Sequence, residues 1–233
     1  MILFYTSNIE NQLAYLEAEE ARHCTQVLRK KTGDKVHFVD GNGGFYEGIL
    51  QEVHKRNCTI RIIKSQIPFK PRPFRLHIAI APTKNNSRFE WFLEKATELG
   101  IDEITPIICQ HSERRKLRID RLQKVLVAAM KQSLKAYLPI LNEPISFKQF
   151  TTLPRTNTAK YIAQGQEKLH LKNNYEAGND VLVMIGPEGD FAEEELLLAA
   201  QNDFRGVNLG KSRLRTETAG LVACHVLNLL CEE

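Results

Sequence analysis

The stretch LGKSRLRTETAGLVACHV, residues 209–226, decides how the C-terminal part of the chain is interpreted. Gly210 turns the chain after a short apolar segment, three basic side chains follow, and the remainder is apolar with helical spacing. Arg215 and Glu217 therefore stand where a helix is about to begin, and Thr216 is a candidate N-cap because a hydroxyl accepts hydrogen bonds from the first helical turn. A structural salt bridge is the alternative to a ligand site for these two charges, and this segment alone favours the salt bridge.

A second glycine loop, IGPEGDF at residues 185–191, has the same design. Gly186 and Gly189 permit backbone conformations and close approaches that a Cβ would prevent, and Pro187 restricts the chain between them. A loop this stiff can present backbone groups to a ligand, although an ordinary strand-to-helix turn has the same spacing. The loop has neither the G-K-[ST] ending of a Walker A motif nor the G-x-G-x-x-G pattern.

Outward from these loops, residues 75–233 alternate strand and helix patterns. Ser87 and Glu90 fit a capping box at the start of one helix, and Gly100 stands at its expected end. Alternation of this kind predicts a parallel sheet covered by helices on both faces, in which ligands bind beyond the carboxyl ends of the strands. Both glycine loops lie at that edge, and this shifts the balance toward a binding site.

Residues 1–67 read mostly as β-structure, with a hairpin turn at Asp40–Gly44 and one helical pattern over residues 19–30. Three prolines between residues 68 and 73 form a stiff connector. We therefore predict two domains, residues 1–70 and residues 74–233.

The composition is that of a globular protein, with 42% apolar and 26% charged residues among 233. No apolar run reaches the roughly 18 residues typical of a membrane span, and the N-terminus lacks the pattern of a signal peptide, so we expect a cytoplasmic protein. The five cysteines form no CxxC pair, and neither His23 nor His111 has metal-ligand partners at usable spacing, so we expect no metal site.

The charge is unevenly distributed along the chain. Residues 1–75 contain 12 Lys and Arg against 8 Asp and Glu, whereas residues 161–233 contain 6 against 12. The segment HSERRKLR at residues 111–118 is a further basic patch. Basic surface in the first two thirds is compatible with a polyanionic partner, and scattered surface lysine is the plain alternative.

These motifs resemble those of the bacterial 16S rRNA N3-uridine methyltransferases, the RsmE family of the SPOUT (trefoil-knot) superfamily. The similar segments are HCTQVLRKKTGD with the GNG turn, EWFLEKATELGIDEITPI, IGPEGDF and LGKSRLRTETA. They occur in the family's order and spacing across nearly the whole chain. The resemblance implies an α/β chain, with a C-terminal parallel-sheet SPOUT domain (74–233) that contains a trefoil knot, preceded by a small PUA-like RNA-binding β-barrel (1–70).

The resemblance also implies a homodimer that binds S-adenosyl-L-methionine (SAM) and acts on 16S rRNA or the 30S ribosomal subunit. It places the cofactor on Gly186, Pro187, Glu188, Gly189, Leu209, Gly210, Leu214, Arg215, Thr216, Thr218 and Ala219. We expect RNA contacts at His23, Arg29, Lys30, Lys31, Lys84, Arg114 and Arg115. The chain departs from the family pattern at Asn85, Ala128, Leu134, Lys135 and Asp190.

Arg215 and Glu217 are the expected catalytic residues. A guanidinium stays protonated, so Arg215 suits stabilisation of negative charge on the uracil oxygens as N3 loses its proton. Glu217 is the first candidate for the base and Glu188 the second, unless Glu217 only orients Arg215. A SPOUT methyltransferase with another RNA target and a non-catalytic RNA-binding or ribosome-assembly factor remain as alternatives.

Overall fold

The computed structural model describes residues 1–232 and divides the chain into two compact units. The first unit contains Met1–Pro71 and Val127–Leu138, and the second contains Arg72–Leu126 and the chain from Pro139 onward. Residues 127–138 thus pack with the first unit by their contacts, although they lie within the predicted span 74–233.

The first unit is built on a six-stranded sheet of order β1-β4-β5-β6-β3-β2, in which only the β1–β4 pair is parallel. The strands are β1 (Leu3–Tyr5), β2 (Ile9–Glu10), β3 (Leu13–Glu17), β4 (Lys35–Val39), β5 (Phe45–Val53) and β6 (Asn57–Gln66). Alternate side chains such as Phe4, Phe38 and Ile60 fill its core. The Asp40–Gly44 turn is closed by Asp40, whose Oδ1 accepts from the backbone N–H groups of Asn42 (2.7 Å) and Gly44 (2.9 Å).

The helix expected over residues 19–30 is shorter than its pattern. Helix α1 covers Ala18–Arg22, and the chain continues as a π-helical turn over His23–Val27 (η1). Arg29 then takes a left-handed conformation with φ 53°. The wider turn keeps Cys24 buried in the core of the unit while the chain turns toward β4.

The second unit contains a wholly parallel sheet of order β10-β8-β7-β12-β11-β13, with β9 also pairing β8. Its strands are β7 (Leu76–Ile80), β8 (Glu103–Ile108), β9 (Ile140–Leu141), β10 (Ile145–Ser146), β11 (Thr158–Ala163), β12 (Asp180–Ile185) and β13 (Arg205–Val207). The parallel sheet predicted from the alternating patterns is therefore confirmed.

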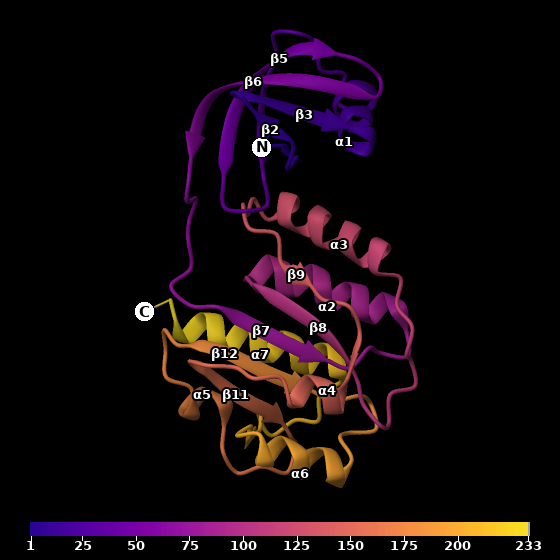
Figure 1. The fold of residues 1–233 in the computed structure, drawn as a ribbon, viewed down its shortest axis with the longest axis vertical. Coiled ribbons are helices and arrows are strands. Elements are labelled where there is room, and N and C mark those ends of the chain that lie inside the picture. The colour runs from indigo at the N-terminus through magenta and orange to yellow at the C-terminus, as the bar shows by residue number, and fades with distance from the viewer. Residues whose placement is uncertain (233) are drawn as a thin grey trace. The chain divides into compact units, whose positions relative to one another are not determined.

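Helices cover both faces of this sheet (Figure 1). The helices from Arg72 onward are α2 (Asn86–Leu99), α3 (Ile119–Gln132), α4 (Phe147–Thr151), α5 (Leu171–Asn174), α6 (Glu193–Gln201) and α7 (Thr216–Leu230), of which α3 continues into the first unit from Val127. On one face α2 and α7 pack against each other and against Ile80 of β7. On the other face, Ala79 and Ala81 join the cluster formed by α4 and α6. Successive residues of β7 thus serve opposite layers, as the strand periodicity requires.

The ends of two helices differ from expectation. The predicted capping box at Ser87 and Glu90 is wrong, because α2 begins at Asn86 and Asn85 is its N-cap, accepting from the N–H of Ser87 at 2.9 Å. The carboxylate of Glu90 instead pairs with Arg121 of α3. The predicted N-cap role of Thr216 is also wrong, because Arg215 occupies the cap position and Thr216 is the first helical residue.

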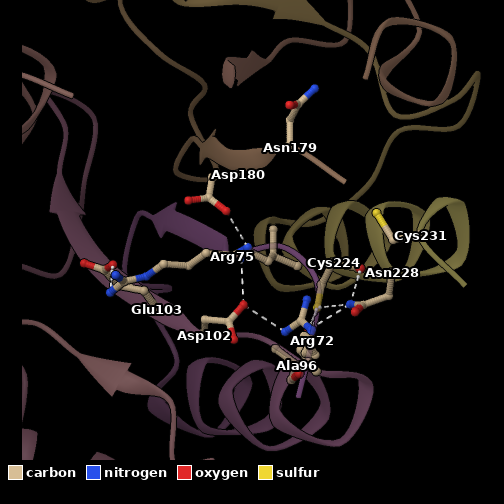
Figure 2. Close-up of polar contacts among 12 residues, drawn as sticks. Arg72, Arg75, Ala96, Asp102, Glu103, Asn179, Asp180, Cys224, Asn228 and Cys231 are labelled. Carbon is tan, nitrogen blue, oxygen red and sulfur yellow. Dashed lines mark hydrogen bonds and ion pairs between the residues drawn. The ribbon is translucent and has the colours of Figure 1, made fainter. Parts of the chain in front are cut away.

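Figure 2 shows how the chain enters the second unit. The backbone N–H of Arg75 donates to Asp180 Oδ1 (2.8 Å), and its guanidinium pairs with Glu103 (2.8 Å). Asp102 accepts from the N–H of Leu76 (2.7 Å) and pairs with Arg72 (2.9 Å). Burial raises the pKa of the Asp102 carboxyl even though Arg72 lowers it. These bonds fix the amino end of β7 between those of β8 and β12.

The last helix is fixed at its far end by a buried amide. Asn228 Nδ2 donates to the carbonyl of Gly100 (2.8 Å), at the end of α2, and to that of Cys224 (2.8 Å) one turn earlier (Figure 2). Because β13 lies at the edge of the sheet, the chain must return across the carboxyl ends of β11 and β12 before α7 can pack on α2. This return carries the segment 208–215 past the loop that follows β12.

Candidate active site

The two glycine loops meet at the carboxyl edge of the sheet. β12 and β13 both neighbour β11, so the loops that follow them emerge on either side of this strand. The hydroxyl of Thr216 donates to the carbonyl of Gly186 at 3.0 Å and joins the start of α7 to the β12 loop. The predicted cofactor residues of the two loops are thus brought together by a direct hydrogen bond.

The β13 loop is shaped by Asn208 and Gly210. Asn208 Oδ1 accepts from the N–H of Gly210 (3.1 Å), and its Nδ2 donates to the carbonyl of Glu167 (2.7 Å). Gly210 has φ +134°, a conformation that other residues adopt only with strain. A Cβ there would meet no atom within 4 Å, so the backbone borders open space that a ligand can enter.

The β12 loop is packed more tightly. A Cβ on Gly186 would lie 3.1 Å from the ring of Phe191, and one on Gly189 would lie 3.1 Å from Cβ of His111. Asp190, where the resemblance expects glycine, has φ 58°. Aspartate is among the few residues that tolerate this left-handed conformation, so the substitution preserves the course of the loop.

Glu217 lies on the buried side of the first turn of α7. The residue is 6% exposed, and its Oε1 is 3.7 Å from Arg88 Nε. Its other oxygen, Oε2, is buried and has no hydrogen-bond partner among residues 1–232. A buried carboxylate oxygen without a donor is costly, so this atom is a ready acceptor for a donor that a ligand supplies.

Arg215 is exposed, and within the described chain no ion pair holds its guanidinium. Its carbonyl accepts from the N–H of Ala219 at 2.7 Å as part of α7. The cation beside Glu217 is therefore Arg88, in the first turn of α2, and not Arg215. Sequence reasoning missed Arg88, although its place directly after the β7 loop put it at the correct edge of the sheet.

Three of the expected RNA-contacting residues gather beside the β12 loop. Lys84, Arg114 and Arg115, together with Glu113 and Lys116, line an open pocket of about 410 Å³. The backbone N–H of Lys84 donates to Glu188 Oε1 (3.1 Å), so Glu188 is engaged in holding two loops together. Lys84 Nζ pairs with Glu113 at 2.8 Å, which raises the pKa of the lysine.

His111 makes a contact that the sequence did not suggest. Its Nδ1 lies 3.0 Å from the carbonyl oxygens of both Gly189 and Asp190. Because carbonyl oxygens only accept, Nδ1 must carry a proton and donate to this pair. His111 therefore fixes the β12 loop by hydrogen bonds to two of its carbonyl groups.

The remaining expected RNA contacts lie in the first unit. Arg29 and Lys31 are exposed and Lys30 is partly buried, close to the turn at Arg29. His23 packs edge-on against the ring of Phe4, with centroids 5.9 Å apart, so it contributes to the core boundary of this unit.

Three of the positions at which the chain departs from the family pattern also lie in the first unit: Ala128, Leu134 and Lys135. Leu134, where the resemblance expects glycine, has φ 55° and an exposed side chain. The chain keeps the left-handed turn after α3 at this position without the residue that suits it best.

A larger cavity of about 590 Å³ opens at the opposite, amino edge of the sheet. Its polar groups bond to one another: Asn142 Nδ2 donates to Glu103 and to Thr105 (both 2.7 Å), and His77 Nε2 lies 2.8 Å from Thr105 Oγ1. Burial lowers the pKa of His77 to about 4, although Glu103 acts in the opposite direction. This cavity lies at the end of the sheet where ligands of parallel α/β folds do not bind.

No group of three or more His, Cys, Asp or Glu side chains is placed to hold a metal ion within residues 1–232. In the same part of the chain no helix has the length and apolar character needed to cross a bilayer.

Comparison with known proteins gives a consistent result. A family model described as RNA methyltransferase domain matches residues 70–228, and one described as RNA methyltransferase PUA domain matches residues 16–63. The ribosomal RNA small subunit methyltransferase E of Rickettsia conorii is 30% identical over 234 residues, covering 96% of this chain and 94% of the relative.

Two solved structures are similar over their whole length. A probable rRNA-methyltransferase from Porphyromonas gingivalis has a TM-score of 0.92 and 38% identity, covering 100% of this chain and 99% of that chain. A ribosomal RNA small subunit methyltransferase E from Neisseria gonorrhoeae, bound to S-adenosyl methionine, has a TM-score of 0.90 and 26% identity, covering 99% and 98%. The predicted fold class, a parallel-sheet methyltransferase domain preceded by a PUA-like domain, is confirmed, and the trefoil knot stays a prediction.

Proposed function

Since the chain belongs to the RNA methyltransferase family that includes the ribosomal RNA small subunit methyltransferase E proteins, we propose that it methylates N3 of a uridine in 16S rRNA. It is a SAM-dependent rRNA methyltransferase. The uridine target and the residue roles given below are the parts of this proposal that go beyond family membership.

One observation carries the assignment of the site: the buried Glu217 Oε2, at the start of α7, has no hydrogen-bond partner among residues 1–232 and lies beside the loops that the family resemblance assigns to the cofactor. The open space at Gly210 and the backbone groups of the β12 loop fit a cofactor bound mainly through main-chain atoms. Gly186–Gly189, Leu209–Gly210 and the first turn of α7 are the residues that we expect to hold SAM. When bound, SAM supplies an activated methyl group on its sulfonium.

The protein's own residues then have to prepare the nucleophile. Uridine N3 carries a proton and is reactive only when that proton is lost, and its Watson–Crick edge must be unpaired or flipped out. Glu217 Oε2 has a lone pair that no donor of the described residues occupies, so it can accept the N3 proton as a general base. Arg88, 3.7 Å from the other oxygen, orients the carboxylate without occupying Oε2.

Arg215 has a separate role in this proposal. It is exposed at the cap of α7, where its permanently charged guanidinium can reach negative charge that develops on the uracil oxygens. Because Arg215 forms no ion pair within the described chain, its charge is available to substrate.

Cations on both units would contact the phosphates of the rRNA backbone. Lys84, Arg114 and Arg115 line the basic pocket beside the active-site loops, and Arg29, Lys30 and Lys31, with His23 nearby, lie in the first unit. Contacts of this kind position the target without reading its sequence. We also propose that the enzyme is a cytoplasmic homodimer, an assembly that would cover the exposed Trp91, Leu99 and Leu229 of α2 and α7.

The direct test is transfer of tritium from labelled SAM to 30S particles purified from cells that lack this gene, followed by nucleoside analysis. Label in N3-methyluridine supports the proposal. Label in another nucleoside would retain the methyltransferase activity and replace the target. Absence of both label and SAM binding would leave a non-catalytic RNA-binding or ribosome-assembly factor. Light scattering of the purified protein tests the dimer separately.

A further inference from the structure

The segment between β8 and α3 is attached to the β12 loop by several bonds from different residues. We call residues 110–116 the latch segment. We propose that RNA phosphate bound in its basic pocket and SAM bound at the β12 loop strengthen each other's binding, and that His111 is the positioning residue that transmits this coupling. The inference rests on the proposed function and adds a regulation of the same site.

His111 forms the first attachment. Its Nδ1–H is shared between the carbonyls of Gly189 and Asp190, each at 3.0 Å. The fit is close, because a Cβ on Gly189 would lie 3.1 Å from Cβ of His111. The peptide units that His111 holds belong to the loop expected to bind SAM, so the latch segment and that loop must shift together.

Lys84 forms the second attachment. Arg114 donates from Nε (3.1 Å) and Nη2 (2.8 Å) to the carbonyl of Lys84, and the N–H of Lys84 donates to Glu188 Oε1 (3.1 Å). A continuous set of hydrogen bonds therefore runs from Arg114 in the basic pocket, through the backbone of Lys84, to Glu188 in the β12 loop. A third bond, from the N–H of Gln110 to Glu195 Oε1 (2.9 Å), joins the latch segment to the helix that follows this loop.

The charges of the pocket make RNA phosphate its natural occupant. Four cations, from Lys84, Arg114, Arg115 and Lys116, surround one carboxylate, that of Glu113. Nε and Nη2 of Arg114 are engaged by Lys84, which leaves Nη1 for an outside acceptor. Guanidinium and ammonium groups in an open pocket are suited to backbone phosphate, the group that dominates the affinity of proteins for nucleic acids.

The sign of the coupling follows from what each ligand orders. A phosphate in the pocket immobilises Arg114 and Lys84, and through them the loop that receives SAM. A second ligand that binds an already ordered loop loses less conformational entropy, so its affinity rises. Linkage requires that SAM raise the affinity for RNA by the same factor. Typical coupling between sites is about 5- to 150-fold, and we expect the lower part of that range for an open pocket.

The test measures binding of labelled S-adenosylhomocysteine, which cannot donate a methyl group, with and without saturating 30S particles from cells that lack this gene. We expect about 5- to 10-fold tighter binding in the presence of 30S. His111→Ala should bring this ratio close to one. His111→Asn should restore it, because the amide Nδ2 of asparagine takes the place of the imidazole Nδ1. His54→Ala, which removes an exposed imidazole from the turn between β5 and β6, is the matched control.

The ratio of two affinities measured on one protein separates coupling from a folding defect, which would weaken both affinities together. Equal binding with and without 30S in the wild type overturns the proposal, and so does an unchanged ratio in His111→Ala. Failure of the wild type to bind S-adenosylhomocysteine at all would instead overturn the proposed function, so the two failures are distinguishable.

Discussion

Glu217 is the residue at which burial, charge and an unfilled hydrogen bond coincide. Its carboxylate is held from one side by Arg88, and Oε2 has no donor among the described residues. Such a group gains most when substrate supplies the missing donor, since an unpaired buried acceptor costs about 1–3 kcal/mol. The imide N–H of uracil is a donor of this kind.

Replacing Glu217 with Gln should reduce kcat about 10²- to 10⁴-fold, the usual contribution of a general base, with little change in SAM affinity. Single-turnover methylation of 30S and equilibrium SAM binding measure the two quantities. Glu193→Gln is the matched control, because this carboxylate is exposed at the start of α6 and has no part in the proposed site. Near-normal turnover of Glu217→Gln at every pH would remove Glu217 as the base.

His77 predicts a stability effect far from the active site. Its folded-state pKa is depressed to about 4 by burial, from 6.5, so between these values the unfolded chain binds more protons than the folded one. The free energy of unfolding should therefore fall by about 2 kcal/mol as pH is lowered from 7 to 5. The stability that depends on a neutral His77 continues to fall until the pH is below about 4, where both states are protonated.

Urea unfolding of the wild type and of His77→Gln at pH 7 and pH 5 measures the effect. The variant should lose much of the pH slope, whereas His54→Gln, which removes an exposed imidazole, should keep it. A slope that is the same in all three proteins would show that His77 does not titrate in this way.

At this scale the sequence located Arg215 and Glu217 but not their neighbours. Both charges could be assigned to a helix start from the glycine turn and the apolar run that follows. Arg88 and His111 could not, because each acts through a partner about 80 or more positions away along the chain. Only the folded sheet edge brings such residues together.

The α2–α7 pair is the element on which the site depends, because it sets the position of the first turn of α7. Gly220 has no room for a side chain: a Cβ there would lie 2.7 Å from Cε2 of Phe92 in α2 and 2.9 Å from Cδ1 of Ile80 in β7. Contacts this short force α7 or its neighbours to move.

Gly220→Ala should therefore destabilise the protein by about 1–3 kcal/mol, even though alanine favours helix. The shift should also lower SAM affinity, because α7 begins at the site. Gly165→Ala is the control, since a Cβ there meets nothing within 4 Å. Thermal unfolding and SAM titration check both effects, and a stabilised Gly220→Ala would contradict the packing argument.

Periodicity identified the long elements of the second unit but missed the short ones. β9 and β10 are two residues each and α4 only five, so none spans enough residues to establish a period. The capping box at Ser87 failed because Asn85, two residues earlier, is an equally good cap and sits directly at the loop.

For the whole molecule, the family resemblance predicts a trefoil knot, which the periodicity of the sequence could not predict. Alternating patterns predict a parallel sheet, and general rules of chain topology argue against a knot, because knots are very rare. The division of charge along the chain, in contrast, could be read directly: the cations of residues 1–75 outnumber the anions, and the reverse holds for residues 161–233.

This asymmetry predicts where salt should act. Each phosphate contact removed from a protein–RNA complex lowers the slope of log K against log[salt] by about 0.7 to 0.9. Substituting Arg29, Lys30 and Lys31 with Gln should therefore reduce that slope by up to about 2 to 3 units and weaken 30S binding at low salt. SAM affinity should not change, because these three residues lie in the other compact unit from the active-site loops.

The matched control removes the same charge from the acidic part of the chain, by substituting the exposed Lys168, Lys172 and Arg205 with Gln. Filter binding of 30S particles over a range of salt concentrations gives both slopes. If the control lost as much slope as the first triple variant, net charge alone would govern association and the basic first unit would have no special part in it. A loss confined to the first variant instead means that residues 29–31 contact the rRNA backbone.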